Sequence, residues 1–396
     1  MLGGPRVAGA EALTLDAALV RAMQSNVELA AARADLVAAR GRLEQASVLA
    51  ANPVVTSSGT NHRIARETNI DAAVSLGQEL QVGGQRGLRM AAARFDVEHA
   101  EALRADHERL VAGEVRRAFA GLVAAERRQV VAAEVAAQSR RVAGIAVTRL
   151  AQGDVGRLDV DLARLDQTKA EGDAAAAVTD MERATARLAV ALGAGPDETF
   201  ALVAPEDAPH AIPAEADVID HALATRPDLR AARAERARLD GEADLTRRVG
   251  LIPNPTIRGF YSHENGDETL VGGEISVPLP VFDRQGGAEL DLRGQAASAA
   301  AAVVRLERQI PRDVHLALAR HRTAEATWAR RRRDANVAPA ARATLERALS
   351  AGLLGLSDVL VQQDRLRDAR RADVDAWLDL REAEADVVEA VGENPW

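Results

Sequence analysis

Apolar residues recur at helical spacing near the start of the chain. The positions that fit a helical period are Leu19, Met23, Val27, Leu29 and Leu36. The predicted helix begins near Thr14, which is suited to cap it, and ends at Asn52-Pro53, because proline cannot continue a helix. The second half of the chain repeats this plan with a helix predicted at about residues 218–250.

A pair of segments with a period of two follows each predicted helix. Strands are predicted at about residues 54–60, 69–80, 256–263 and 269–277. In the last of these, one face carries Val271, Ile275 and Val277, and the other is mostly small or polar. Such a strand suits lipid or protein core on one side and water on the other.

The longest pattern is a proline-free run from Gly87 to about Leu150. Roughly 64 residues at about 1.5 Å each make a helix of about 95 Å, and its apolar positions are seven, or four and three, residues apart, as in a coiled coil. A short turn at 153–156 and a helix at 159–193 follow, so the two helices are expected to be antiparallel neighbours.

The second half has the same order, with a long helix at about 288–350, a turn at 352–355 and a last helix at 357–391. Pro311 is expected to kink that long helix or to remove one of its hydrogen bonds.

The chain contains a duplication with an offset of about 200 residues. The landmarks that recur in register include Asn52-Pro53 as Asn254-Pro255, Gly153 as Gly352, and Asp159-Val160 as Asp358-Val359. So long a period indicates a duplicated half-molecule and not a solenoid. We predict a first repeat at 1–195, a linker at 196–215 and a second repeat at 216–396.

Composition narrows the class of protein. The 396 residues include five Phe, three Trp and one Tyr, which favours long helices packed through small side chains. A formal net charge of -9 argues against nucleic-acid binding. The absence of cysteine excludes disulfides, thiolate metal sites and a lipid-anchor cysteine, and no stretch of 18 uncharged apolar residues is present to form a transmembrane helix.

Motifs for enzymatic chemistry are also missing from the sequence. It has no Gly-rich phosphate loop, His-Glu metal motif or nucleophile elbow, so we expect no enzyme, catalytic residue, cofactor or resident metal. His62 and His263 occupy equivalent places in the two strand pairs, where they are more typical of solvent-facing residues than of a metal site. Residues 330–333 are four consecutive arginines, which favour a solvated or tunnel-facing surface.

The four strands have two interpretations. About eight strands is the practical minimum for a membrane barrel, so four that cross a membrane must share one barrel with other chains. The alternative is a small antiparallel sheet that caps a helical bundle. The first residues, Met1 to Arg6, have no apolar signal-peptide core, so we expect either a mature form or a protein that is not exported.

The duplication, the Asn-Pro before each strand pair, the segment Ile275–Gly286 and the pattern Gly352–Val359 together resemble the TolC-like outer-membrane efflux proteins. The resemblance covers about residues 13–392, and residues 253–287 are most similar to the heavy-metal cation branch. It implies a mainly α fold with a small β part. In a homotrimer, four strands per chain would build a twelve-stranded barrel in outer-membrane lipid, above a periplasmic α-barrel of long helical hairpins.

The implied task is passive. The trimer would conduct substrate, with heavy-metal cations expected, from an RND-type inner-membrane transporter and a periplasmic adaptor (membrane fusion) protein to the outside. Within the family, a multidrug or type I secretion duct is the alternative. Outside it, the alternative is a soluble coiled-coil scaffold whose apolar tips bind partner helices.

The resemblance also assigns roles to two groups of residues. The tips that would meet the adaptor are Gly153, Val155 and Gly156 in the first half and Gly352, Leu353, Leu354 and Gly355 in the second, where exposed Val155, Leu353 and Leu354 would form an apolar patch. The alternative for both is an ordinary helical turn.

Asp159 and Asp358 match acidic positions near the narrow end of the tunnel, where three copies of each would attract cations. A helix-capping role fits their spacing equally well. The sequence departs from the best-known gate of the family, because Leu354 and Val361 stand where that pattern has Arg and Asp, so a salt-bridged lock is not expected here.

Overall fold

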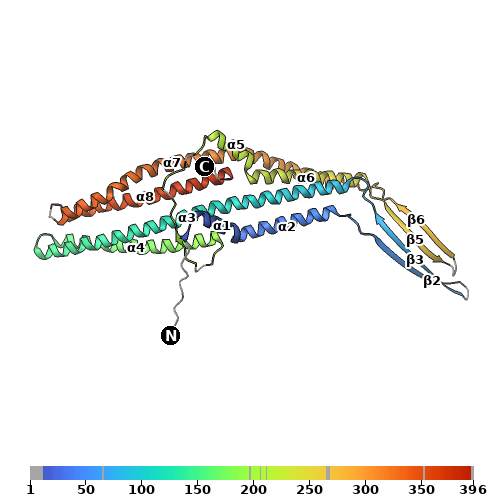
Figure 1. Ribbon diagram of the computed structural model, residues 1–396, viewed down its shortest axis with the longest axis horizontal. Helices are drawn as coiled ribbons and strands as arrows, with labels where there is room; N and C mark the ends of the chain where they lie inside the picture. The colour runs from blue at the N-terminus through green and yellow to red at the C-terminus, as the bar shows by residue number, and fades with distance from the viewer. Residues whose placement is uncertain are drawn as a thin grey trace, which may run out of the picture. The chain divides into compact units, whose positions relative to one another are not determined.

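The computed structural model describes residues 12–64, 67–195, 198–205, 207–210, 212–264, 268–350 and 353–393. The elements of the first half are β1 (Ala12–Leu13), α1 (Leu15–Ser25), α2 (Val27–Ser47), β2 (Val54–Ile64), β3 (Glu67–Glu79), α3 (Gln85–Gln152) and α4 (Arg157–Leu192). Those that follow are β4 (Ala201–Leu202), α5 (Glu215–Thr225), α6 (Pro227–Leu251), β5 (Thr256–Glu264), β6 (Glu268–Ser276), α7 (Gly286–Ser350) and α8 (Leu356–Val391). The predicted mainly α fold with a small β part is confirmed (Figure 1).

Each helix predicted before a strand pair is in fact two helices. Asn26 has extended backbone between α1 and α2, and its side-chain Oδ1 accepts the N–H of Glu28 at 2.9 Å, which caps the start of α2. In the second half, Pro227 is the first residue of α6 and keeps the preceding Arg226 out of the helical conformation. The prediction of single helices was therefore wrong at equivalent places in the two halves.

The four predicted strands form one antiparallel sheet with the order β2-β3-β5-β6. The predicted hairpins are β2-β3 and β5-β6. Pairing of β3 with β5, in which Val74 lies opposite Tyr261, joins the strands of the two halves.

The described chain forms two compact units. Unit 1 contains the described residues within 1–30, 106–226 and 309–396, and unit 2 contains those within 31–105 and 227–308. Each unit takes segments from both predicted repeats. The predicted repeats describe the order of elements along the chain and not compact units, so the two units do not test the repeat boundaries, which stay a prediction.

The core of unit 1 combines a few large side chains with many alanines. Phe119 of α3 and Trp377 of α8 are buried together with Leu188, and Ala18 and Ala22 of α1 are completely buried beside them. In unit 1, α1 packs against α4, and α5 packs in the same way against α8. Small side chains let these helices approach closely, as the composition predicted.

The long helix α7 continues through two prolines, Pro311 and Pro339, so Pro311 does not end it. Because proline has no N–H, each removes one backbone hydrogen bond from the helix. Ile310, next to the first proline, is completely buried. None of the helices among the described residues is both long and apolar enough to cross a membrane.

In unit 2, the helices pack through another small cluster, in which Leu36 and Ala39 of α2 contact Ala100 of α3. His99 of α3 is held by its ring Nδ1, which lies 2.9 Å from the carbonyl oxygen of Ala231 in α6. The sheet also belongs to this unit.

Candidate functional site

The first helical hairpin reverses at Gly153. This residue has a φ of +81°, a conformation that favours glycine. Its N–H donates to the carbonyl of Leu150 at 3.0 Å, and the N–H of Asp154 donates to that of Arg149 at 2.9 Å. This pair of bonds is a Schellman motif, which satisfies the last carbonyls of α3 and turns the chain back into α4.

The second hairpin turns in a similar way. The N–H of Leu353 donates to the carbonyl of Ala348 at 2.9 Å, the counterpart of the bond from Asp154 to Arg149. Gly355 then has extended backbone and precedes α8, as Gly156 precedes α4. Gly352, one of the predicted tip residues, lies outside the described residues.

The predicted apolar residues of the tips are not equally exposed. Leu353 is 78% exposed, whereas Val155 and Leu354 are half-buried. Leu354 packs against a cluster, which we call the tip cluster, formed by Val142, Ala143, Ala146, Val160, Ala163 and Val359 of both hairpins. The expected exposure of Leu354 is therefore not met, because packing of one hairpin against the other covers it.

The two predicted gate residues lie beside this cluster. Asp159 and Asp358 directly precede Val160 and Val359, which are buried in it. The Oδ2 atom of Asp159 accepts the N–H of Gly156 at 3.0 Å, so the capping role is present at this residue. Asp358 is exposed in the first turn of α8. A cap uses one carboxylate oxygen and leaves the negative charge in place, so capping and cation attraction are compatible.

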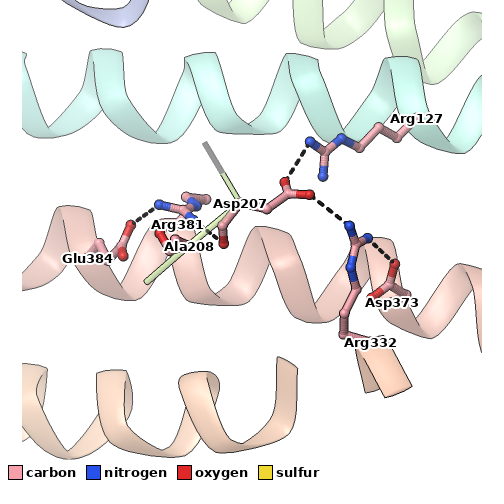
Figure 2. A network of polar contacts seen from close by, with 7 residues as sticks. All are labelled: Arg127, Asp207, Ala208, Arg332, Asp373, Arg381 and Glu384. Atoms are coloured by element: carbon pink, nitrogen blue, oxygen red, sulfur yellow. Dashed lines mark hydrogen bonds and ion pairs between the residues drawn. The ribbon is translucent and has the colours of Figure 1, made fainter. Parts of the chain in front are cut away.

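A second polar site lies in unit 1, where the linker after α4 crosses three helices. Figure 2 shows Asp207 of this linker between two arginines. Its Oδ1 atom is 2.9 Å from Nη2 of Arg127 in α3, and its Oδ2 atom is 2.9 Å from Nη2 of Arg332 in α7. Arg332 also pairs with Asp373 of α8 at 3.2 Å. We call these four residues, together with Ala208, Arg381 and Glu384, the linker clamp.

Arg381 of α8 holds the linker backbone in the same clamp. Its Nη2 atom donates to the carbonyl oxygens of Asp207 and Ala208, at 2.9 and 3.0 Å, and its Nη1 atom pairs with Glu384 at 2.8 Å. The buried Trp377 lies nearby, with its ring centroid 4.2 Å from the guanidinium carbon of Arg127 and 5.7 Å from that of Arg381. Both distances are typical of cation–π contacts.

Glu384 is almost completely buried, and it stays charged because of its neighbours. Burial acts to raise the pKa of its carboxyl group. His321, Arg381 and His210 act in the opposite direction and leave the pKa below its ordinary value. His210 contributes both its backbone N–H and its ring Nδ1, at 3.2 and 3.1 Å from Oε1 of Glu384.

The sequence analysis missed the linker clamp. Arg332 belongs to the run of four arginines that was expected to face solvent or a tunnel, and instead it binds a linker residue 125 positions away. The one local signal was Asp207 in a Pro-containing linker, and nothing in the sequence near it identifies its partners.

The register of the sheet sorts its side chains into two faces. One face, which we call the apolar face, combines side chains of all four strands: Val55, Ile70, Val74, Leu76, Ile257, Tyr261, Val271 and Ile275. All eight side chains are exposed, and that of Val271 has the largest exposed fraction, 79%. The opposite face carries Thr56, Ser75 and Ser262 and the ion pair of Arg258 with Glu274, and its apolar members include Val54, Phe260 and Leu270.

The two histidines of the strands have different partners in the register of the sheet. His263 pairs with Ala72 of β3, whereas His62 pairs with Asn69. In the part of the chain that the structure describes, no group of three or more His, Asp or Glu side chains is arranged to hold a metal ion.

Comparison with known proteins gives one sequence relative and several structural ones. No family model matches the chain. The cobalt-zinc-cadmium resistance protein CzcC of Cupriavidus metallidurans is 27% identical over 276 residues, which are 69% of this chain and 65% of that protein. The match thus spans less than two thirds of the relative's length.

The structural relatives cover nearly the whole chain. CusC, described as forming a transmembrane channel, has a TM-score of 0.81 at 14% identity over 99% of this chain and 95% of that one. The outer membrane protein VceC of Vibrio cholerae has a TM-score of 0.77 at 17% identity, over 96% and 97%. A membrane protein from Pseudomonas aeruginosa has a TM-score of 0.79 at 20% identity, over 95% and 93%.

CusC is described as forming a transmembrane channel, VceC as an outer membrane protein and CzcC as a resistance protein, and none of these descriptions names an enzyme. The chain has the fold of the TolC-like outer-membrane channels, and its similarity to a cobalt-zinc-cadmium resistance protein supports the predicted resemblance to the heavy-metal branch of that family.

Proposed function

We propose that this chain is one subunit of a homotrimeric outer-membrane duct that passively conducts metal cations out of the cell. The observation that carries the proposal is the exposed apolar face of the sheet, to which both halves of the chain contribute. Large apolar patches on a protein surface usually meet lipid or another protein. A sheet with one mostly apolar face and a second face of mixed, more polar character suits the wall of a water-filled membrane barrel.

The sheet edges support assembly from several copies. Within one chain, β2 and β6 are the edge strands of the sheet and each has one side without a strand beside it. The strands alternate in direction, so β6 of one copy is antiparallel to β2 of the next when the copies form a ring. Ring closure removes the free edges, and three copies give the twelve strands of the predicted barrel.

The tips and the acidic residues take their proposed roles from this assembly. The hairpin turns would bind the helical hairpins of a periplasmic adaptor that leads to an RND-type inner-membrane transporter, with Leu353 as the most exposed apolar contact. Three copies of Asp159 and Asp358 would place rings of negative charge at the same end. The name of the sequence relative supports divalent cations as cargo.

The molar mass in mild detergent, measured by light scattering with correction for bound detergent, tests the proposal. We expect a trimer of about 126 kDa of protein, three times 42.0 kDa, that aggregates when the detergent is removed. A monomer or dimer that is indifferent to detergent would refute it and favour the soluble scaffold.

Two neighbouring residues of β6 give a matched test of the barrel. Val271 lies on the apolar face and Leu270 on the opposite one. An arginine on the lipid side of a barrel costs about 2–4 kcal/mol near the middle of the bilayer, whereas the lumen tolerates it. We therefore expect Val271→Arg to impair membrane assembly and Leu270→Arg to preserve it. Equal effects of the two substitutions would contradict the assignment of the faces.

A further inference from the structure

The segment between β6 and α7 exposes apolar side chains beyond the end of the sheet. Leu279 and Val281 are 77% and 64% exposed, and Phe282 is fully exposed. These residues continue the apolar stripe of Val271, Ile275 and Val277 along the same stretch of chain. We call residues 277–282 the junction segment.

The residues just beyond the junction segment fix its end. The carbonyl of Arg284, just beyond it, lies so close to Gly250 of α6 that no larger residue fits at that glycine without movement. The Oδ1 atom of Asp283 accepts the N–H of Gln285 at 2.8 Å, and Nε of Arg284 donates to the carbonyl of Pro280 at 3.2 Å. Phe282 is therefore an exposed residue directly before a hydrogen-bonded turn.

The backbone of the segment is suited to a place with little water. Pro278 and Pro280 have no N–H group that would need a partner. The N–H of Val281 donates to the carbonyl of Leu279 at 2.8 Å. Unpaired backbone N–H groups are costly where water is scarce, and the two prolines lower their number in this segment.

The first half of the chain differs at the equivalent positions. Residues 201 positions before Leu279 and Phe282 are Gln78 and Gln81, whereas the counterparts of Val277 and Val281 are Leu76 and Leu80, which are also exposed. The side chain of Gln78 donates to the carbonyls of Ala51 and Glu79, at 2.9 and 2.8 Å. The first half is therefore polar at these two positions, and duplication alone does not account for Leu279 and Phe282.

We infer that the junction segment is a membrane anchor, in which Phe282 inserts at the boundary between lipid headgroups and acyl chains on the helix side of the barrel. The nine residues of β6 at about 3.4 Å each, tilted by about 40°, span roughly 23 Å, close to the apolar band of about 25 Å in such barrels. The residues that follow therefore lie at the interface, where aromatic side chains are favoured. Asp283 and Arg284 come next, and they remain in water. This inference rests on the proposed barrel.

The absence of native cysteine makes a direct test possible. A nitroxide spin label is attached to Phe282→Cys in the full chain, reconstituted in vesicles of phosphatidylethanolamine and phosphatidylglycerol. Its accessibility is measured to oxygen, which dissolves in lipid, and to a water-soluble nickel chelate. The reference variants are Val271→Cys on the apolar face and Leu290→Cys, an exposed apolar position of α7.

We expect the label at Phe282→Cys to collide with the chelate several-fold less often than the label at Leu290→Cys, and to have an oxygen accessibility between those of the two references. Chelate accessibility equal to that of Leu290→Cys would overturn the inference. So would a label shielded from both reagents, which would show that a second copy of the chain covers the segment. If Val271→Cys is itself open to the chelate, the proposed barrel fails and the anchor with it, whereas a lipid-exposed Val271→Cys beside a chelate-exposed Phe282→Cys rejects the anchor alone.

Discussion

Breaking the linker clamp at Asp207 is expected to destabilise unit 1 by a modest and measurable amount. Its carboxylate bridges Arg127 and Arg332, and the three side chains are 33%, 29% and 42% exposed. A buried hydrogen bond to a charged group contributes about 1.5–3 kcal/mol, but solvent at this exposure reduces each pair to about 0.5–1 kcal/mol. Removal of both pairs by Asp207→Ala should therefore cost about 1–2 kcal/mol. Asp207→Asn should cost less, because its amide oxygen still accepts one bond.

The cost can be separated from a general effect of charge. Asp180 of α4 is 62% exposed and forms an ion pair with Arg183, three residues further along the same helix. Asp180→Asn therefore makes the same change of charge away from the linker, and it should change the free energy of unfolding by less than about 0.5 kcal/mol. Denaturant unfolding in detergent, followed by tryptophan fluorescence, reports on the clamp through Trp377, which lies next to Arg127.

A double-mutant cycle of Asp207→Asn with Arg332→Gln gives the decisive comparison. Residues in direct contact should show a coupling free energy of at least about 0.5 kcal/mol. Additivity of the two substitutions within about 0.3 kcal/mol, or an Asp207→Asn variant as stable as Asp180→Asn, would refute the clamp as a stabilising contact.

Three further predictions concern the proposed duct and its stability. Asp358→Asn should lower the preference for cations over anions in planar bilayer recordings, and unchanged selectivity would remove this residue from the gate. Leu353→Asp should abolish metal efflux in cells while trimer assembly is retained, and full efflux would contradict the tip assignment. Substitution of the half-buried Leu354 is a less specific test, because its loss would also disturb the tip cluster. The folded state lowers the pKa of Glu384 from 4.5, so the contribution of this carboxylate to stability is present above about pH 4.5 and is lost as the pH falls through the lower folded value. In a plot of melting temperature against pH, Glu384→Gln should therefore reduce the decrease at acidic pH. A decrease that is identical in the variant would show that other groups cause it.

Much of the fold follows from local patterns in the sequence. Alternation predicted the four strands of the antiparallel sheet, because a half-buried strand imposes a period of two on its own residues. The short parallel pair of β1 and β4 was not predicted. Gly153 predicted a reversal, because a left-handed conformation favours glycine. The break before α6 was also visible, since Arg226-Pro227 carries the restriction that proline places on the residue before it. It was overlooked because the hydrophobic period continues across it.

The linker clamp and the burial of Leu354 have a different origin. The partners of Asp207 are 80 and 125 residues away along the chain, and Arg381 reaches its carbonyl over 174. Leu354 is covered by the packing of one hairpin on the other. Periodicity reports which side of an element is apolar but not which distant segment meets it, so neither contact is encoded in any local pattern.

The two halves of the chain keep their backbone plan and differ in the side chains that it presents. Both hairpins make the same long turn bond, from Asp154 in one and from Leu353 in the other, so a charged residue and an exposed apolar one occupy equivalent places. In a trimer of duplicated chains, six similar hairpins would surround the tunnel, and identical tips would offer six equivalent sites to a partner. Because the tips differ, the proposed trimer offers two sets of three. The junction segment also differs from its counterpart in the first half, where Gln78 and Gln81 stand in place of Leu279 and Phe282. Duplication thus explains the architecture, and the divergence of the copies lets one architecture present different surfaces to a partner and to the membrane.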